Sequence, residues 1–232
     1  PEKFAQIEQR LREKGRRSGI CALFYGGPGV GKTETVKQIA KATGRDIFMV
    51  DMALKSKWIG ESEKNLKQIF KTYKRLVRES EAAPILLFNE ADAIFGKRLV
   101  EETSAEKLNN ALQNIILQEM ETLDGIMIAT TNLQQNLDKA FERRFLYKIK
   151  FEKPTVEARI QIWRTMIPDL SEMDAKTLAA KYDFSGGQIE NIARHYTIDS
   201  ILHDAKEDKL AMLINHCDNE RLDEHAPKRI GF

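Results

Sequence analysis

The feature that most constrains this chain is the glycine-rich segment 26–33, which reads Gly-Gly-Pro-Gly-Val-Gly-Lys-Thr. It matches the G-x-x-x-x-G-K-[ST] phosphate loop at every fixed position. Glycines let backbone N–H groups curl around phosphate oxygens, which a Cβ would obstruct. An apolar run over 20–25 precedes the loop, and a helical pattern over 33–41 follows it. This strand–loop–helix order predicts a nucleotide-binding α/β fold rather than a chance glycine-rich turn.

Two side chains of the loop carry specific chemistry. Lys32 brings a positive charge to the β- and γ-phosphates, and Thr33 presents a hydroxyl to Mg²⁺. Thr33 also begins a helix whose N-terminal dipole favours an anion. The predicted ligands are therefore ATP or ADP together with Mg²⁺. The residues predicted to contact the nucleotide here are Gly27, Pro28, Gly29, Val30, Gly31, Lys32, Thr33 and Glu34.

Short apolar runs alternate with helical patterns as far as Pro154. Strands are predicted at 20–25, 47–50, 85–88, 126–129 and 147–151, and helices between them at 62–78, 105–123 and 137–142. This alternation predicts the α/β class, with a five-stranded parallel sheet flanked by helices. Beyond Pro154 only helical patterns follow, at 156–166, 174–181, 187–203 and 208–216. We expect a nucleotide-binding domain over 1–153, in which 1–19 form a leading helix and linker, and a small all-helical lid domain over 154–232.

Composition limits the classes of partner. With 232 residues and 42% hydrophobic content, the chain is long enough for one large or two small domains. A net charge of +2 gives no electrostatic reason to expect nucleic acid or a membrane surface as a partner. Cys21 and Cys217 form neither a disulfide framework nor a metal-ligand spacing. The absence of a secretory signal predicts a cytoplasmic location, and the start at Pro1 indicates a segment of a longer protein.

Polar residues follow two of the predicted strands. Asn89 and Glu90 come directly after one apolar run, and Thr131 and Asn132 follow another. The carboxyl ends of parallel strands are where such sheets bind ligands. Glu90 is therefore interpreted as a ligand-site residue rather than as the cap of a helix, since the phosphate loop occupies the same edge.

The order of these signals, with an arginine pair and a helical tail after them, resembles the AAA+ ATPase family and more narrowly its AAA branch, over residues 20–200. The resemblance implies that Glu90 polarises the water that attacks the γ-phosphate and that Asn132 orients this water. Segment 137–143 is similar to the Leu-Asp-Pro-Ala-Leu-x-Arg stretch of the family. Arg143 and Arg144 would then be arginine fingers for the neighbouring subunit's nucleotide. From the residues alone, a pair of surface salt bridges explains them too.

Two further stretches resemble family features. Lys57, Trp58, Ile59 and Gly60 are similar to the aromatic–hydrophobic–glycine pore loop of protein translocases, although spacing alone explains Trp58 by packing. Segment 98–102 falls near the second, charged pore loop. The resemblance implies a homo-oligomeric ring, specifically a hexamer, that grips a protein substrate.

The segment 185–188, Ser-Gly-Gly-Gln, resembles the start of the lid helix where adenine is held, which adds Gly187 to the nucleotide contacts. Arg194 lies further along the same helix, where a solvated helix face explains it better than a contact with nucleotide.

The chain departs from the family pattern at two places. Asn89 replaces the aspartate on the metal side of the second nucleotide motif. Its amide oxygen can accept a hydrogen bond from Thr33 or from a Mg²⁺-bound water, but it brings no charge, so either weaker Mg²⁺ binding or a shifted water shell around the metal is expected. Asp92 follows the strand and is expected to be a poor geometric substitute. The family's Pro-Gly between the two arginines is also missing.

These observations favour an ATP-hydrolysing motor core that remodels or threads a protein. An ATP-gated assembly switch with little or no hydrolysis is the alternative, and Asn89 is the residue that supports it. A nucleic-acid remodelling relative is a third hypothesis, which the near-neutral net charge and the aromatic loop disfavour.

Overall fold

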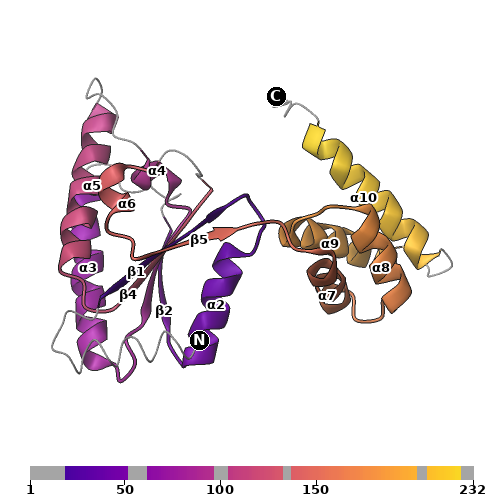
Figure 1. Cartoon of the computed structure of the whole chain (residues 1–232), viewed down its shortest axis with the longest axis horizontal. Helices are drawn as coiled ribbons and strands as arrows, with labels where there is room; N and C mark the ends of the chain where they lie inside the picture. Colours follow the sequence, from indigo (N-terminus) through magenta and orange to yellow (C-terminus); the bar gives the residue numbers. More distant parts are fainter. Residues whose placement is uncertain (1–18, 52–61, 97–103, 133–136, 203–207, 226–232) are drawn as a thin grey trace. The chain divides into compact units, whose positions relative to one another are not determined.

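The computed structural model describes residues 19–51, 62–96, 104–132, 137–202 and 208–225 (Figure 1). By their contacts, these residues form two units. The first contains the residues up to Gly27 together with Lys32–Phe151, and the second contains Pro28–Gly31 and Glu152–Phe232. The functional division into a nucleotide-binding domain over 1–153 and a lid over 154–232 stays a prediction.

The first unit is built on one sheet of five strands in the order β2-β3-β4-β1-β5. Every strand pair is parallel, which confirms the predicted α/β class. The order places β1 beside β4, and β4 beside β3, so the carboxyl ends of these three strands share one edge. The strands are β1 (Ile20–Gly26), β2 (Ile47–Asp51), β3 (Ile85–Asn89), β4 (Ile126–Thr131) and β5 (Tyr147–Phe151).

Helices cover both faces of this sheet, with α2 on one side and α3 and α5 on the other (Figure 1). Side chains of a strand alternate between its two faces. Accordingly, Ala22 and Phe24 of β1 pack in one hydrophobic cluster with Val36 of α2. Cys21 and Leu23 belong to the opposite cluster, which α3 and α5 close. The helices of this unit are α2 (Lys32–Thr43), α3 (Ser62–Glu79), α4 (Asp92–Phe95), α5 (Ser104–Glu121) and α6 (Lys139–Glu142).

A buried tyrosine fixes α3 on the sheet. The Tyr73 hydroxyl lies 3.0 Å from the carbonyl oxygens of both Pro84 and Ile126, and it accepts a hydrogen bond of 2.8 Å from the Ile126 N–H. A Cβ at Gly125 would come within 2.4 Å of this hydroxyl. The amino ends of β3 and β4 are therefore tied to one side chain of α3.

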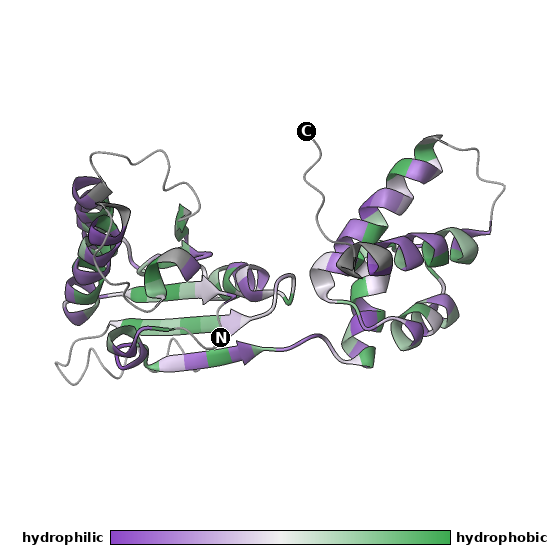
Figure 2. Cartoon of the chain, turned by 90° about the horizontal axis from the view of Figure 1, so that it is seen from above, coloured by the Kyte–Doolittle hydropathy of each residue, from purple (hydrophilic) through white to green (hydrophobic). Residues whose placement is uncertain are grey.

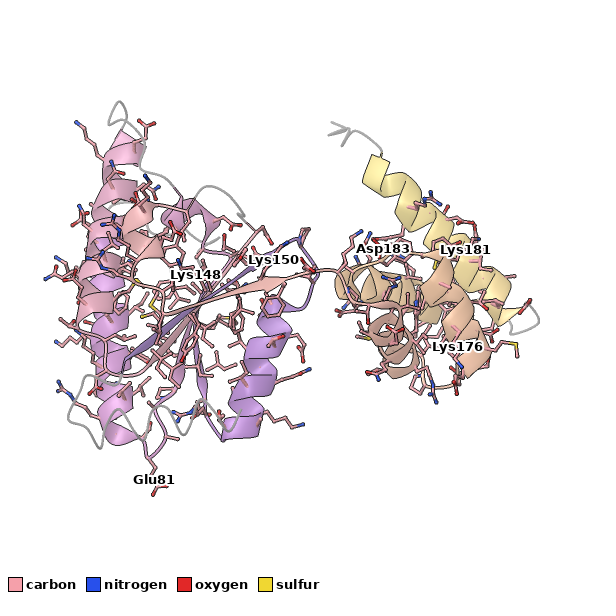
Figure 3. All side chains as sticks on the ribbon, in the orientation of Figure 1. Glu81, Lys148, Lys150, Lys176, Lys181 and Asp183 are labelled. Atoms are coloured by element: carbon pink, nitrogen blue, oxygen red, sulfur yellow. The ribbon has the colours of Figure 1, made fainter. Side chains whose placement is uncertain are left out.

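The hydropathy of the elements follows this layering. Figure 2 shows mainly hydrophobic strands between helices whose outer sides are hydrophilic. The edge strand β5 differs, because Lys148 and Lys150 extend from it as exposed side chains (Figure 3). Charged side chains, lysine above all, discourage an edge strand from pairing with another chain.

The second unit contains four described helices around a core of its own, as the sequence predicts. Trp163 is fully buried there with Leu178 and Leu213. The buried Arg159 guanidinium donates hydrogen bonds to Asp183 Oδ1 at 2.6 Å and to Ala179 O at 3.1 Å. The helices are α7 (Val156–Met166), α8 (Glu172–Lys181), α9 (Gly186–Leu202) and α10 (Lys209–His225).

Two helices differ from the sequence prediction. The short helix α4 was not predicted, because four residues show no period. Helix α10 continues nine residues past His216, to His225. In the described part of the chain, no helix combines the length and the apolar character that crossing a membrane requires.

Candidate functional site

Lys32 begins α2, immediately after the glycine-rich loop, and its side chain is only 9% exposed. Its Nζ donates hydrogen bonds to Gly26 O at 2.9 Å, to Gly27 O at 2.7 Å and to Asn132 Oδ1 at 2.7 Å. An ammonium group has three donors, so all of them are engaged. The structure thus joins the predicted phosphate lysine directly to the predicted sensor asparagine, a hundred residues further along the chain.

Burial lowers the pKa of Lys32, because desolvation disfavours the charged ammonium. The carboxylates of Asp92 and Glu90 act in the opposite direction and favour the protonated form. The site therefore holds a buried cation that interacts with two carboxylates from the segment after β3. Such a cation suits an anionic ligand, because it sits in a low-dielectric surrounding that strengthens its attraction for phosphate.

Asn89 lies at the end of β3, within hydrogen-bond distance of Thr33, whose hydroxyl is predicted to bind Mg²⁺. Thr33 Oγ1 donates to Asn89 Oδ1 at 2.7 Å, and Thr130 Oγ1 donates to the same oxygen at 3.0 Å. The expected hydrogen bond between Thr33 and Asn89 is confirmed. Hydroxyl and amide oxygens are ligands that suit Mg²⁺, which keeps several waters and uses few protein ligands. Among the described residues, no group of three or more His, Cys, Asp or Glu side chains is placed to hold a metal ion.

Glu90 has an unusual backbone conformation. Its φ is +51°, and it is the one non-glycine residue of the described chain with a positive φ. Its N–H donates to Thr130 Oγ1 at 3.1 Å, whereas its exposed carboxylate has no hydrogen bond or ion pair within the described chain. Such strain costs on the order of 1–3 kcal/mol and concentrates at active sites. The fold thus holds this carboxylate free at the edge of the sheet.

Asp92, the first residue of α4, holds Asn132, the predicted sensor, by hydrogen bonds. Its Oδ1 accepts a hydrogen bond of 2.8 Å from the Asn132 N–H and another from the Thr131 hydroxyl. Its Oδ2 lies 3.4 Å from Asn132 Nδ2. One side of the Asn132 amide therefore faces Asp92 and the other faces Lys32. Sequence reasoning missed this role, because it tested Asp92 only as a substitute for the metal-side acid; its spacing three residues after Asn89 was the available signal.

The two arginines after α6 have different surroundings. Arg144 donates to Ala140 O at 3.1 Å and forms an ion pair with Glu121 of α5. Arg143 is exposed, and its side chain makes no hydrogen bond or ion pair with any described residue. Asp138 caps α6 by accepting a 2.7 Å hydrogen bond from the Ala140 N–H. Among the described residues, Arg144 is thus held within its own chain, whereas the side chain of Arg143 is exposed and has no such partner.

The tip of the glycine-rich loop belongs to the second unit by its contacts. Gly29 has a φ of +69° and Gly31 has a φ of +91°, conformations that favour glycine. Gly187 N donates to Gly29 O at 2.9 Å, and a Cβ on Gly187 would come within 2.9 Å of Gly29 Cα. The structure therefore brings Gly187 against Gly29, two residues that were both predicted to contact nucleotide.

Other predicted positions are placed apart from this network or lie outside the described residues. Glu34 is exposed on α2, where its carboxylate lies 3.8 Å from Lys37 Nζ. Arg194 is exposed and pairs with Glu190 at 3.4 Å, which confirms a solvated helix face. Both predicted pore loops fall outside the described residues, namely Lys57, Trp58, Ile59 and Gly60, and segment 98–102.

Comparison with known proteins agrees with this geometry. Residues 22–153 match the family described as "ATPase family associated with various cellular activities (AAA)". Protein CdcH of Halobacterium salinarum is 29% identical over 223 residues, covering 91% of this chain and 28% of that protein. Vacuolar protein sorting-associated protein 4B of Mus musculus is 33% identical over 184 residues, or 74% of this chain and 40% of that protein.

A third relative is the katanin p60 ATPase-containing subunit A1 of Strongylocentrotus purpuratus, 29% identical over 77% of this chain and 36% of that protein. The chain thus spans less than half the length of each of these relatives. The family match covers more than half of this chain and includes the glycine-rich loop and both polar strand ends. The chain belongs to the AAA family of ATPases.

Proposed function

We propose that this chain is the Mg·ATP-binding and ATP-hydrolysing core of a protein-remodelling motor. The observation that carries the proposal is the hydrogen-bonded array of Lys32, Thr33, Asn89 and Asn132 at one edge of the sheet. The sequence predicts a role for each of these residues in ATP chemistry, and their side chains converge although they are far apart in the chain. Glu90 stands at the same edge, and its exposed carboxylate makes no hydrogen bond or ion pair with a described residue.

The donor set fits the nucleotide and its metal. The Lys32 ammonium and the N–H groups of the loop would hold the phosphates, while Thr33 and Asn89 oxygens would hold Mg²⁺ directly or through water. Bound Mg·ATP supplies an electrophilic γ-phosphorus and a metal that neutralises charge on the phosphate oxygens.

The remaining roles belong to the residues of this chain. Glu90 accepts a proton from the attacking water, as a general base. Asn132 positions that water through its amide, whose orientation Asp92 fixes. Arg143 is supplied by a neighbouring copy of the chain and stabilises charge in the transition state, for which arginine fingers are worth about 10³–10⁵ in rate.

The proposal includes a homo-oligomeric ring of six subunits: the use of Arg143 requires a neighbouring chain, and the resemblance to the AAA branch supports the ring and its number of subunits. In such a ring, Lys57, Trp58, Ile59 and Gly60 would line a central channel and pull on a protein segment. The resemblance of these residues to a translocase pore loop supports this part of the proposal. The side chain of Arg143, which is exposed and has no partner among the described residues, supports the ring.

Steady-state ATP hydrolysis measured against protein concentration, at several Mg²⁺ concentrations, tests the proposal. Turnover per chain should rise with protein concentration, because the site is completed between subunits. Glu90→Gln should lower turnover by about a hundredfold or more, in the range lost with a general base, and leave ATP binding intact. Unchanged turnover in Glu90→Gln would contradict the assignment.

A second experiment tests protein threading. Deletion of the predicted pore loop, which contains Trp58, should abolish the stimulation of ATP turnover by an unfolded protein and leave the basal turnover unchanged.

An ATP-gated assembly switch is the second candidate, and Asn89 favours it. The side chain of Asn89 is neutral, so it supplies no negative charge to Mg²⁺. Its oxygen also already accepts hydrogen bonds from the hydroxyls of Thr33 and Thr130. Tight ATP binding that changes the oligomeric state, with slow turnover insensitive to added protein, would identify the switch.

A further inference from the structure

The outer face of α3 forms a basic groove, defined here by the five basic side chains Lys67, Lys71, Lys74, Arg75 and Arg78. The groove has a volume of about 610 Å³, and the carboxylate of Glu119 on α5 lies in it as well. Its surplus of positive charge exceeds the net charge of the whole chain, which is +2. Figure 3 shows nitrogen-tipped side chains along the side of the first unit where α3 and α5 lie.

Most of this charge is not neutralised by the described residues. Lys74 Nζ lies 2.6 Å from Glu119 Oε2, and this is the close pair in the groove. Arg75 Nε lies 4.0 Å from Glu79 Oε1, with both side chains more than 60% exposed, so this pair contributes little. No ion pair with any described residue is made by Lys67, Lys71 and Arg78.

The arrangement has a cost for the helix itself. Lys67 and Lys71, Lys71 and Arg75, and Lys74 and Arg78 are spaced four residues apart, so like charges are neighbours on one face. Like-charge pairs at this spacing destabilise a helix. Packing of the opposite face, where Tyr73 is anchored, offsets the cost. A surface that maintains such repulsion is suited to a ligand of opposite charge.

The spacing of the charges describes that ligand. At a rise of about 1.5 Å per residue, the side chains of residues 67, 71, 75 and 78 repeat every 4.5–6 Å. Carboxylates on every fourth residue of a helix repeat at about the same distance. A second hollow of about 420 Å³, lined by Glu63, Lys64, Lys67, Gln68 and Lys71, continues the groove toward the start of α3. The basic groove thus has the length and charge for a helical segment rich in Glu or Asp.

Nucleic acid fits the basic groove less well. Single strands are bound through aromatic side chains on which bases stack, and no aromatic side chain lines either hollow of the described surface. Domains that bind duplexes are usually more basic than this chain, whose pI is about 8.5. We propose that the basic groove on α3 is a docking site for an acidic protein segment, independent of the ATP site.

The test uses a fluorescein-labelled, alanine-rich helical peptide of about 16 residues, a length of about 24 Å, with Glu at every fourth position. Fluorescence anisotropy is measured at low ionic strength without nucleotide, so the result does not depend on the proposed ATPase activity. Binding is expected, and it should be lost in about 1 M salt, where the Debye length falls to about 3 Å. The same peptide with Gln in place of Glu should not bind.

The matched variants are the double substitutions Lys67→Gln with Lys71→Gln, and Lys37→Gln with Lys41→Gln. Both pairs are exposed lysines four residues apart on a helix, and both lose the same charge. The first should weaken peptide binding roughly tenfold, as expected for two surface ion pairs near the top of their range. The second should leave it unchanged. Equal losses in both variants, no binding of the peptide, or tighter binding of a single-stranded or duplex DNA would each overturn the proposal.

Discussion

Two groups of charged residues in the α/β unit differ in how far their own chain satisfies them. At the carboxyl ends of β1, β3 and β4, Lys32 and Asp92 are joined through Asn132 by hydrogen bonds. At the turn between α6 and β5, Arg143 is exposed and has no partner among the described residues, although the adjacent Arg144 is paired with Glu121.

This difference indicates how the work of the site is divided. Groups that must be held in fixed geometry are ordered within one chain, because a buried polar group without a partner is costly. A side chain that acts on another subunit must not be engaged in hydrogen bonds or ion pairs within its own chain, because it could then no longer bind the neighbouring subunit. Under the proposed function, the strand-end network would be the part of the ATPase site that one chain supplies, and Arg143 the part that it contributes to a neighbouring chain.

The largest expected effect comes from replacing each of the two adjacent arginines in turn and comparing the resulting losses of turnover. Arg143→Ala should lower ATP turnover about 10³-fold, the lower end of the range for an arginine finger. Arg144→Ala removes the same side chain one residue later and should lower turnover less than tenfold, because Arg144 is occupied by Glu121 and Ala140 O. Steady-state turnover of the two variants at matched protein concentration measures the difference.

A mixing experiment identifies where Arg143 acts. Arg143→Ala retains its own Glu90, and Glu90→Gln retains its own Arg143. If the finger acts between subunits, mixing the two inactive variants should restore part of the turnover, because some interfaces then contain both groups. Mixed samples that stay as inactive as the separate variants, while still co-assembling, would place Arg143 outside the reaction.

A smaller effect is expected from loosening the strand-end network. Asp92→Asn keeps the shape of the side chain but removes the charge that faces Asn132 and favours the protonated Lys32. Asp92 is a positioning residue that acts through Asn132, so kcat should fall roughly tenfold while the KM for ATP changes little, which is less than the roughly 10²–10⁴-fold loss expected when a general acid or base is itself removed. Kinetics and thermal unfolding are measured together. A lowered melting temperature with unchanged kcat would show that Asp92 is only structural.

Much of the fold could be predicted from the sequence for a physical reason, and so could the edge of the sheet at which the candidate site lies. Buried parallel strands such as 85–88 read as unbroken apolar runs, and the phosphate loop needs glycine at fixed places. Once the strands were assigned, Asn89 and Asn132 had to lie at one edge of the sheet. The hydrogen bond between Thr33 and Asn89 followed from the same reasoning and is confirmed at 2.7 Å.

The remaining features depend on side-chain directions that no local pattern encodes. The positive φ of Glu90 turns the chain so that Asp92 starts α4 and faces β4. Because of this turn, Asp92 bonds to Asn132 and does not lie beside Asn89, where Mg²⁺ is predicted to bind. Likewise, nothing in the pair Arg143–Arg144 indicates which one Glu121 will bind, because Glu121 is brought near by the packing of α5.

The smallest effect is expected when a negative charge is added to the strand-end network by the substitution Asn89→Asp. Asn89→Asp places a carboxylate where Thr33 and Thr130 already donate hydrogen bonds, so the new group fits the existing donors. The Mg²⁺ concentration for half-maximal turnover should fall, roughly severalfold, because a ligand's charge raises affinity for a hard cation. Asn191→Asp, at an exposed position of α9, adds the same charge elsewhere and should have no effect. A Mg²⁺ titration at fixed ATP measures both variants.

The outcome also distinguishes the two proposed functions. If turnover rises with Asn89→Asp and not with Asn191→Asp, the neutral side chain at position 89 restrains hydrolysis in this chain, and one negative charge at this position separates a motor from a switch. If the Mg²⁺ dependence is unchanged, position 89 does not act on the metal, and Asn89 gives no support to the switch.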